Sequence, residues 1–154
     1  MSLYQTFNGL EPILLSTQIE DTTDENLRQY LDEQTLLFEQ LARDQIRCIS
    51  VIDCSFGTSV TAVQRAMYAD WMKASKPLLD ACLVGTAYVM PSVLVRGALT
   101  AIFWLTRLST PHAVHRELDE GLRWAIDLAK RSDLRLHPSL EREGAAAFRR
   151  VRSA

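Results

Sequence analysis

Short continuous hydrophobic runs alternate along this chain with longer segments in which hydrophobic residues recur every three or four positions. The clearest example begins with residues 46–53, a short run rich in β-branched residues. A polar turn follows, and hydrophobic residues then stand at Val63, Met67 and Trp71. A buried strand, a turn and an amphipathic helix in this order are the start of a parallel strand–helix–strand unit.

Further strands are predicted on both sides of this unit. Residues 12–19 form one, residues 113–115 a short one, and residues 3–8 either an edge strand or an ordered arm. Residues 82–90 are hydrophobic almost throughout, which is typical of a central strand, and Gly85 within them indicates a bulge or a close backbone approach. The predicted fold class is α/β, with a small mixed, mostly parallel sheet of four or five strands and its first one or two strands antiparallel at an edge.

About four helices are predicted, over residues 24–44, 61–75, 92–105 and 117–131. The first follows a capping box formed by Thr22 and Glu25. The second is capped by Thr61, or by Ser59, and residues 78–81 leave room for one further turn. The helices carry hydrophobic stripes, so they can pack against the sheet.

The predicted helix over residues 92–105 is hydrophobic around nearly its whole circumference. Arg96 and Thr100, four residues apart, mark its only polar line. A helix of this kind is usually buried on more than one side, and in a small domain a second subunit can supply the other side. The candidate interface or ligand residues are Arg96, Thr100, Phe103, Trp104 and Arg107, because Arg, Trp and Phe are enriched in interface cores. The alternative, ordinary core packing with one solvated arginine, stays open.

A chain of 154 residues suits one domain with a substantial core. We place this domain at residues 1–131 and interpret residues 132–154, which are rich in Arg and Ala, as a solvated C-terminal tail or a short helix beginning at Pro138. The hydrophobic content of 47% is typical of a globular protein, and the net charge of −2 gives no general attraction to nucleic acid or anionic membranes. The tail shows no alternation of aromatic and basic residues, so a nucleic-acid partner is not predicted.

The location of the protein is predicted from its hydrophobic stretches and its cysteines. The longest hydrophobic stretch, residues 93–105, is too short to span a bilayer and contains Arg96. Three cysteines without CxxC spacing indicate reduced core residues, and the first residues lack the basic and hydrophobic regions of a signal peptide. We therefore predict a cytoplasmic protein without stable membrane insertion.

The turn between residues 53 and 61 is a second candidate site. Its polar side chains are Asp53, Ser55, Thr58, Ser59 and Thr61. Open α/β sheets bind ligands at the carboxyl ends of their strands, and a helix N-terminus attracts anions. The simpler interpretation is that Asp53 accepts backbone N–H bonds in its own turn and that the hydroxyls cap the helix. A single glycine and no lysine exclude a phosphate-binding P-loop.

No catalytic, metal or cofactor site is predicted. His112 and His115 have HxxH spacing, but on a strand these positions point to opposite faces, and His137 lies in the tail. The GxSxG elbow of α/β-hydrolases is absent from the sequence. An enzyme whose site is built from distant residues is therefore the weakest of the functional hypotheses.

Three stretches carry a resemblance to a known family: residues 50–53 with 64–65, residues 85–89 with 96–99 and 103–104, and residues 118–124. The chain resembles the STAS family, the fold of anti-sigma-factor antagonists, and in particular small bacterial STAS-like and SEC14-like proteins. The resemblance covers roughly residues 10–130. It implies a small mixed sheet with helices mainly on one side, and a role in protein–protein signalling or in binding an apolar ligand.

One departure from the family concerns phosphorylation. In members that act as phosphorylation switches, an Asp-Ser-Ser-Gly type helix start carries the phosphorylated serine. Residues 61–64 stand at that place here, and no hydroxyl occupies the phosphorylated position. Thr58, Ser59 and Thr61 lie nearby, but a kinase-operated switch at that site is not predicted.

Two functional hypotheses follow. The first is a non-enzymatic, STAS-like interaction module that forms a homodimer through the helix over residues 92–105, with any other protein partner unknown. The second is a carrier or sensor of a small apolar ligand or lipid. This second function needs a cavity between the sheet and the helix over residues 92–105 or 61–75, where Ala98 and Ala101 are small enough to leave space.

Overall fold

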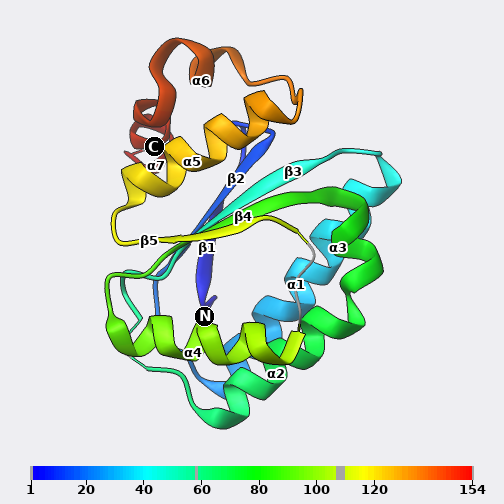
Figure 1. Cartoon of the computed structure of the whole chain (residues 1–154), viewed down its shortest axis with the longest axis vertical. Coiled ribbons are helices and arrows are strands. Elements are labelled where there is room, and N and C mark those ends of the chain that lie inside the picture. The colour runs from blue at the N-terminus through cyan, green and yellow to red at the C-terminus, as the bar shows by residue number, and fades with distance from the viewer. Residues whose placement is uncertain (1, 58, 107–109, 154) are drawn as a thin grey trace.

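A computed structural model describes residues 2–57, 59–106 and 110–153 of the chain. Five strands within them form one sheet in the order β1-β2-β3-β4-β5 (Figure 1). These strands are β1 (Tyr4–Phe7), β2 (Ile13–Gln18), β3 (Cys48–Asp53), β4 (Leu83–Val89) and β5 (His112–His115). β1 runs antiparallel to β2, and the other neighbouring pairs are parallel. The predicted α/β class, with a mostly parallel sheet and an antiparallel edge, is confirmed.

The helices are α1 (Asp24–Arg43), α2 (Ala62–Ala74), α3 (Lys76–Cys82), α4 (Val93–Thr106), α5 (Leu118–Arg131), α6 (Pro138–Glu143), the 3-10 helix η1 (Gly144–Ala146) and α7 (Ala147–Ser153). The four predicted helices correspond to α1, α2, α4 and α5, with small differences at their ends. The described residues contain more helices than the four predicted, because α3 and the C-terminal segment form helices of their own. None of these helices is both long and apolar enough to cross a membrane.

The cap of α1 differs from the prediction by one residue. The Thr23 hydroxyl accepts a hydrogen bond from the Asn26 backbone N–H (3.1 Å), and the Asn26 side chain accepts one from the Thr23 backbone N–H (2.8 Å). The predicted capping box of Thr22 and Glu25 is therefore wrong. The Thr22 hydroxyl instead accepts a bond from the Gln18 side-chain amide (3.4 Å).

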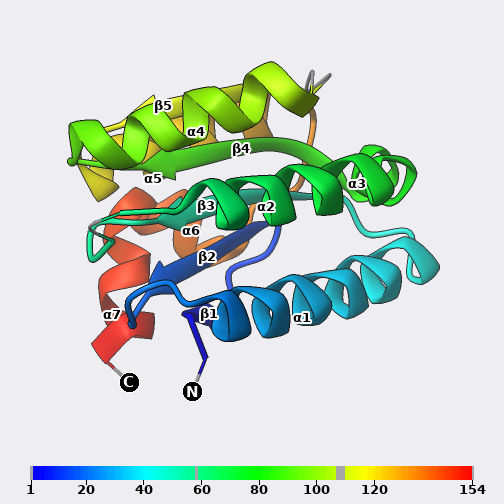
Figure 2. The same ribbon diagram turned by 90° about the horizontal axis from the view of Figure 1, so that it is seen from below.

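Helices cover both faces of the sheet. Because successive residues of a strand point to opposite sides, Leu14 packs with α1 and α3, whereas Ile13 and Leu15 pack with α5, α6 and α7. We call the side covered by α1–α4 the front face and the side covered by α5–α7 the back face (Figures 1 and 2). The resemblance implied helices mainly on one side. That expectation is wrong, because the chain after β5 folds back over the sheet.

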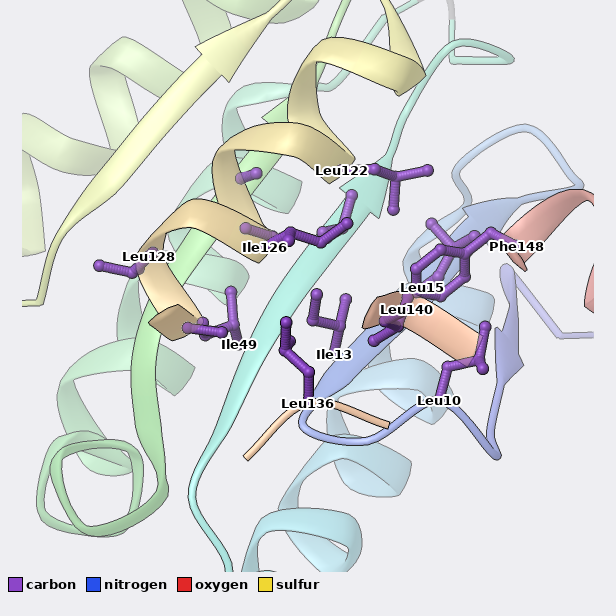
Figure 3. Packing of buried hydrophobic residues seen from close by; sticks show 14 of the residues in the cluster. Leu10, Ile13, Leu15, Ile49, Leu122, Ile126, Leu128, Leu136, Leu140 and Phe148 are labelled. Carbon is purple, nitrogen blue, oxygen red and sulfur yellow. The ribbon is translucent and has the colours of Figure 1, made fainter. Parts of the chain in front are cut away.

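The back face holds one continuous hydrophobic cluster (Figure 3). Its strand residues include Ile13, Leu15 and Ile49, and α5 contributes Leu122 and Ile126. α5 lies very close to the sheet at Gly85, where an added Cβ atom would stand 2.5 Å from Leu128 Cδ2. The same Cβ atom would stand 3.0 Å from the carbonyl oxygen of Pro111, just before β5. The prediction of a bulge or a close approach at Gly85 is confirmed, since the pairing of β3 with β4 also shifts register there, from Cys48 opposite Leu83 to Ile49 opposite Gly85.

The C-terminal segment belongs to this core. Leu136, Leu140 and Phe148 are buried in the back-face cluster, with Phe148 1% exposed. The short helix predicted at Pro138 is present as α6. The interpretation of the segment as a solvated tail is wrong, because its charged residues alternate with hydrophobic ones that pack beneath them against α5 and the sheet.

Candidate functional site

The carboxylate of Asp53, at the end of β3, is held within its own turn. Asp53 is buried, and its Oδ1 atom accepts bonds from the Ser55 backbone N–H (3.0 Å) and from the Ser55 hydroxyl. A backbone N–H bond of this kind is what we expect if Asp53 only stabilises its own turn. A role for Asp53 and Ser55 toward a partner stays a prediction.

The Thr61 hydroxyl caps α2, as predicted. It accepts a bond from the Gln64 backbone N–H (3.1 Å), and the Gln64 side chain accepts one from the Thr61 backbone N–H (3.0 Å). The buried Gln64 amide also donates to Asp24 Oδ1 (3.0 Å), which joins the N-terminus of α2 to that of α1. The Thr61 hydroxyl therefore serves as a helix cap. Thr58 lies outside the described residues.

α4 presents opposite faces to the protein and to the surroundings. Its inner residues Val95, Leu99 and Ile102 are buried against the sheet and α2. Its outer face is exposed along Val93, Leu94, Gly97, Thr100 and Trp104. Three of these side chains are large and apolar: Val93 is 72% exposed, Leu94 75% and Trp104 82%.

The predicted interface residues divide between these two sides. Phe103 packs against the ring of Tyr88 (centroids 5.5 Å apart) and that of His112 (4.4 Å), whereas Trp104 points outward. Thr100 is exposed, and its hydroxyl donates to the Arg96 carbonyl one turn earlier (3.0 Å). Arg107 lies outside the described residues. Phe103 therefore lies on the inner side of α4 and Trp104 on the outer side, a difference that the sequence alone does not predict.

A cavity of about 70 Å³ lies beneath α4, at the carboxyl ends of the parallel strands. Its walls come from the sheet, α2 and α4, and include Ile52, Tyr68, Tyr88, Val95, Ala98 and Ile102. The β3–α2 turn contributes Gly57, Ser59 and Val60 at its edge. None of the described residues that line it is charged. A carrier of a small apolar ligand needs a cavity between the sheet and α2 or α4. This cavity lies there, and Ala98 is in its wall.

A second cavity of about 50 Å³ lies on the same face toward the amino ends of the strands. Ile52, Tyr68 and Tyr88 line both cavities and form the partition between them. The second cavity also reaches α1 and α3, and its lining includes Lys76 and Asp80, whose side chains form an ion pair (2.7 Å).

The phenols and the thiol that line the cavity beneath α4 have raised pKa values. The Tyr4 hydroxyl and the Cys54 Sγ atom form a hydrogen bond of 3.2 Å. Burial raises the pKa of the Cys54 thiol to about 12, although the bond with Tyr4 acts in the opposite direction. Burial likewise raises the pKa values of Tyr4, Tyr68 and Tyr88 above their usual range. The thiol is therefore not a thiolate nucleophile, and the phenols retain their hydrogen atoms.

The two histidines of β5 occupy opposite faces, as predicted. His112 packs on Phe103 at the front, and His115 packs on Trp124 of α5 at the back (centroids 6.4 Å apart). The His115 Nδ1 atom lies 3.7 Å from Glu120 Oε2. Within the described residues, no three side chains of His, Cys, Asp or Glu gather into a group that could hold a metal ion.

The tyrosines around the cavities could not be found from sequence spacing. Tyr4, Tyr30, Tyr68 and Tyr88 come from β1, α1, α2 and β4, so only the folded chain brings them to one face of the sheet. No protein-family model matches the chain, and no curated protein matches its sequence. We therefore infer the function from the geometry of α4 and of the space beneath it.

Proposed function

We propose that the protein is a non-enzymatic interaction module of the STAS-like kind, which associates with a second copy of itself through the outer face of α4. The observation that carries the proposal is the exposure of Val93, Leu94 and Trp104 on one side of a single helix. Exposed apolar side chains that are grouped, rather than scattered, are typical of protein contact sites.

A second copy suits this face because the face has no charge of its own. Val93, Leu94, Gly97, Thr100 and Trp104 carry no ionisable side chain, so two such faces can pack without charge repulsion. An added Cβ atom at Gly97 would meet nothing within 4 Å, so the backbone is open to close approach by another helix. The Thr100 hydroxyl already has its acceptor, and its burial would leave no donor unpaired.

The size of the face sets the expected strength of the dimer. A helix of 14 residues is about 21 Å long. A standard interface buries roughly 800 Å² on each partner, more than one helix side provides. Surface beside α4 must therefore contribute as well, and α2 is a helix in contact with α4. We expect a weak dimer whose population depends on protein concentration.

The test is sedimentation equilibrium of matched leucine variants over a wide range of protein concentration. We expect Leu94→Glu to be monomeric, because the glutamate would have to be desolvated in the interface. Leu36→Glu, which removes a leucine that is 66% exposed on α1, should dimerise like the unmodified protein. Trp104→Glu should reproduce Leu94→Glu from the other end of α4. Circular dichroism checks that each variant is folded.

Two results would overturn the proposal. The first is an unmodified protein that stays monomeric at every concentration reached. The second is equal dissociation by Leu36→Glu and Leu94→Glu, which would show that the contact does not involve α4. The expected cytoplasmic location belongs to the same proposal, and it is supported by Cys48, Cys54 and Cys82, which are all free and buried.

A further inference from the structure

The cavity beneath α4 is the feature that self-association does not use. It is formed by the inner side of α4, so it is separate from the outer face proposed to contact a second copy. Its position at the carboxyl ends of β3 and β4 is the position at which open α/β sheets bind ligands. The lining there is mainly apolar, as in small-molecule sites generally.

The volume of the cavity limits the size of a guest. A single water needs roughly 10–15 Å³, so about 70 Å³ accommodates approximately five groups of the size of a water or a methyl group. An acyl chain would not fit, whereas a branched alkyl group would. A larger molecule could enter only with one end.

The chemistry of the walls defines the guest further. No charged side chain lines the cavity among the described residues, so an ionised guest would lose its hydration without a counter-charge. The polar side chains in the lining include the phenols of Tyr4, Tyr68 and Tyr88, and the Tyr68 hydroxyl accepts a hydrogen bond from that of Tyr88, so its own hydrogen atom can be donated to a guest. A hydroxyl or carbonyl oxygen on the guest can form a hydrogen bond there.

We propose that this cavity binds a small uncharged molecule with a branched alkyl end and an adjacent hydroxyl or carbonyl oxygen. Ala98 provides the space on the α4 side, and Tyr68 and Tyr88 form the inner wall. This proposal does not depend on dimerisation, because monomer and dimer contain the same cavity.

The test uses isobutanol as the probe and isobutyrate as its charged counterpart. Each is titrated into the full chain and followed through amide chemical shifts. We expect isobutanol to shift amides of β3, β4 and the inner side of α4 in a saturable manner, and isobutyrate to leave them unchanged. Ala98→Leu, which fills the cavity, should weaken isobutanol binding by about tenfold or more. Ala74→Leu makes the same replacement at an exposed position of α2 and should bind like the unmodified protein.

A second variant separates the hydrogen bond from the space. Tyr68→Phe keeps the ring and removes the hydroxyl, so it should weaken isobutanol severalfold while leaving xenon, an apolar probe, unaffected. If Ala98→Leu fails to fold, Ala98→Val is measured in its place and should weaken binding in the same direction. Equal affinity of Ala98→Leu and the unmodified protein for isobutanol, or equal binding of isobutyrate and isobutanol, would overturn the proposal.

Discussion

On the back face of the sheet, the described buried side chains form one continuous cluster, whereas on the front face they divide into four smaller ones. Both cavities lie at the front, between the sheet and α1–α4. The chain's three cysteines and four tyrosines also pack there, and none belongs to the back-face cluster. The sheet therefore separates a side with one continuous apolar cluster from a side with smaller clusters and two cavities.

This difference suggests a division of roles between the two faces. A continuous apolar core contributes stability in proportion to the area that it removes from water. A face with cavities and buried hydroxyls sacrifices part of that contribution and gains space in which another molecule can be held. If stability and binding are divided in this way, matched substitutions on the two faces should have different effects.

The largest expected effect is the loss of an aromatic side chain from the back face. Phe148 and Phe38 are both buried phenylalanines, at the back and the front respectively. Phe148→Ala should lower the free energy of unfolding by about 3–5 kcal/mol, because the close-packed surroundings cannot fill the space. Phe38→Ala should lower the free energy of unfolding by less, because Phe38 already borders a cavity. Urea denaturation of both variants makes the comparison, and an equal or larger loss at Phe38 would refute the difference in packing.

The next effect concerns the two glycines whose surroundings differ most. Gly85→Ala places a methyl group against the Pro111 carbonyl and the side chains of α5, and it should destabilise by about 1–3 kcal/mol. Gly97→Ala meets open space in α4 and should stabilise by up to about 1 kcal/mol through helix propensity. Melting temperatures of the two variants should therefore move in opposite directions. A shift of the same sign in both would contradict the close approach of α5 to the sheet.

Alkaline pH should lower the free energy of unfolding through the buried thiols of the front face. The pKa values of Cys48 and Cys54 are each raised to about 12 by burial. Their protonated forms therefore stabilise the fold fully below the ordinary thiol pKa of about 8.5, and this contribution is lost as the pH rises toward 12. Each group should contribute a slope of up to about 1.4 kcal/mol per pH unit.

The measurement is the free energy of unfolding between about pH 8 and pH 11. Cys54→Ala should show a shallower decline than the unmodified protein, because one ionising group has been removed. The buried tyrosines should steepen the decline above about pH 10, since their pKa values are raised too. A decline that Cys54→Ala leaves unchanged would show that this thiol is not protected in the folded state.

Much of this architecture is readable from the sequence, because strands and helices differ in hydrophobic period. The runs at residues 46–53 and 82–90 predict the central strands, and Gly85 predicts a bulge or a close backbone approach, whose partner, α5, only the structure shows. The packing of the C-terminal segment is not readable in this way, because seven basic residues within 130–154 outnumber its large apolar ones. Leu140 and Phe148 stand at helical spacing, but the segment divides into α6, η1 and α7, so only the fold shows that they share one core with Leu136.

The candidate site is less predictable, because it depends on which way individual side chains point. The composition of α4 indicates that it has more apolar surface than one contact can bury, but Phe103 and Trp104 are adjacent and chemically alike. Their separation into an inner and an outer residue is fixed by the packing of α4 on Tyr88 and His112. The cavity has no sequence signal beyond the small size of Ala98, since a void is a property of several elements together.

The smallest expected effect tests whether the polar edge of the front face is stabilised by its helix caps. Thr61→Ala removes the acceptor for the Gln64 backbone N–H and should lower the free energy of unfolding by about 1 kcal/mol. Thr61→Ser keeps a hydroxyl and should cost much less, and Thr23→Ala should match Thr61→Ala at the cap of α1. Because Gln64 joins the two helix starts, Thr61→Ala should also speed amide hydrogen exchange in the first turn of α1. Faster exchange confined to α2 would show that the two helices open independently, and that the Gln64–Asp24 bond does not couple them.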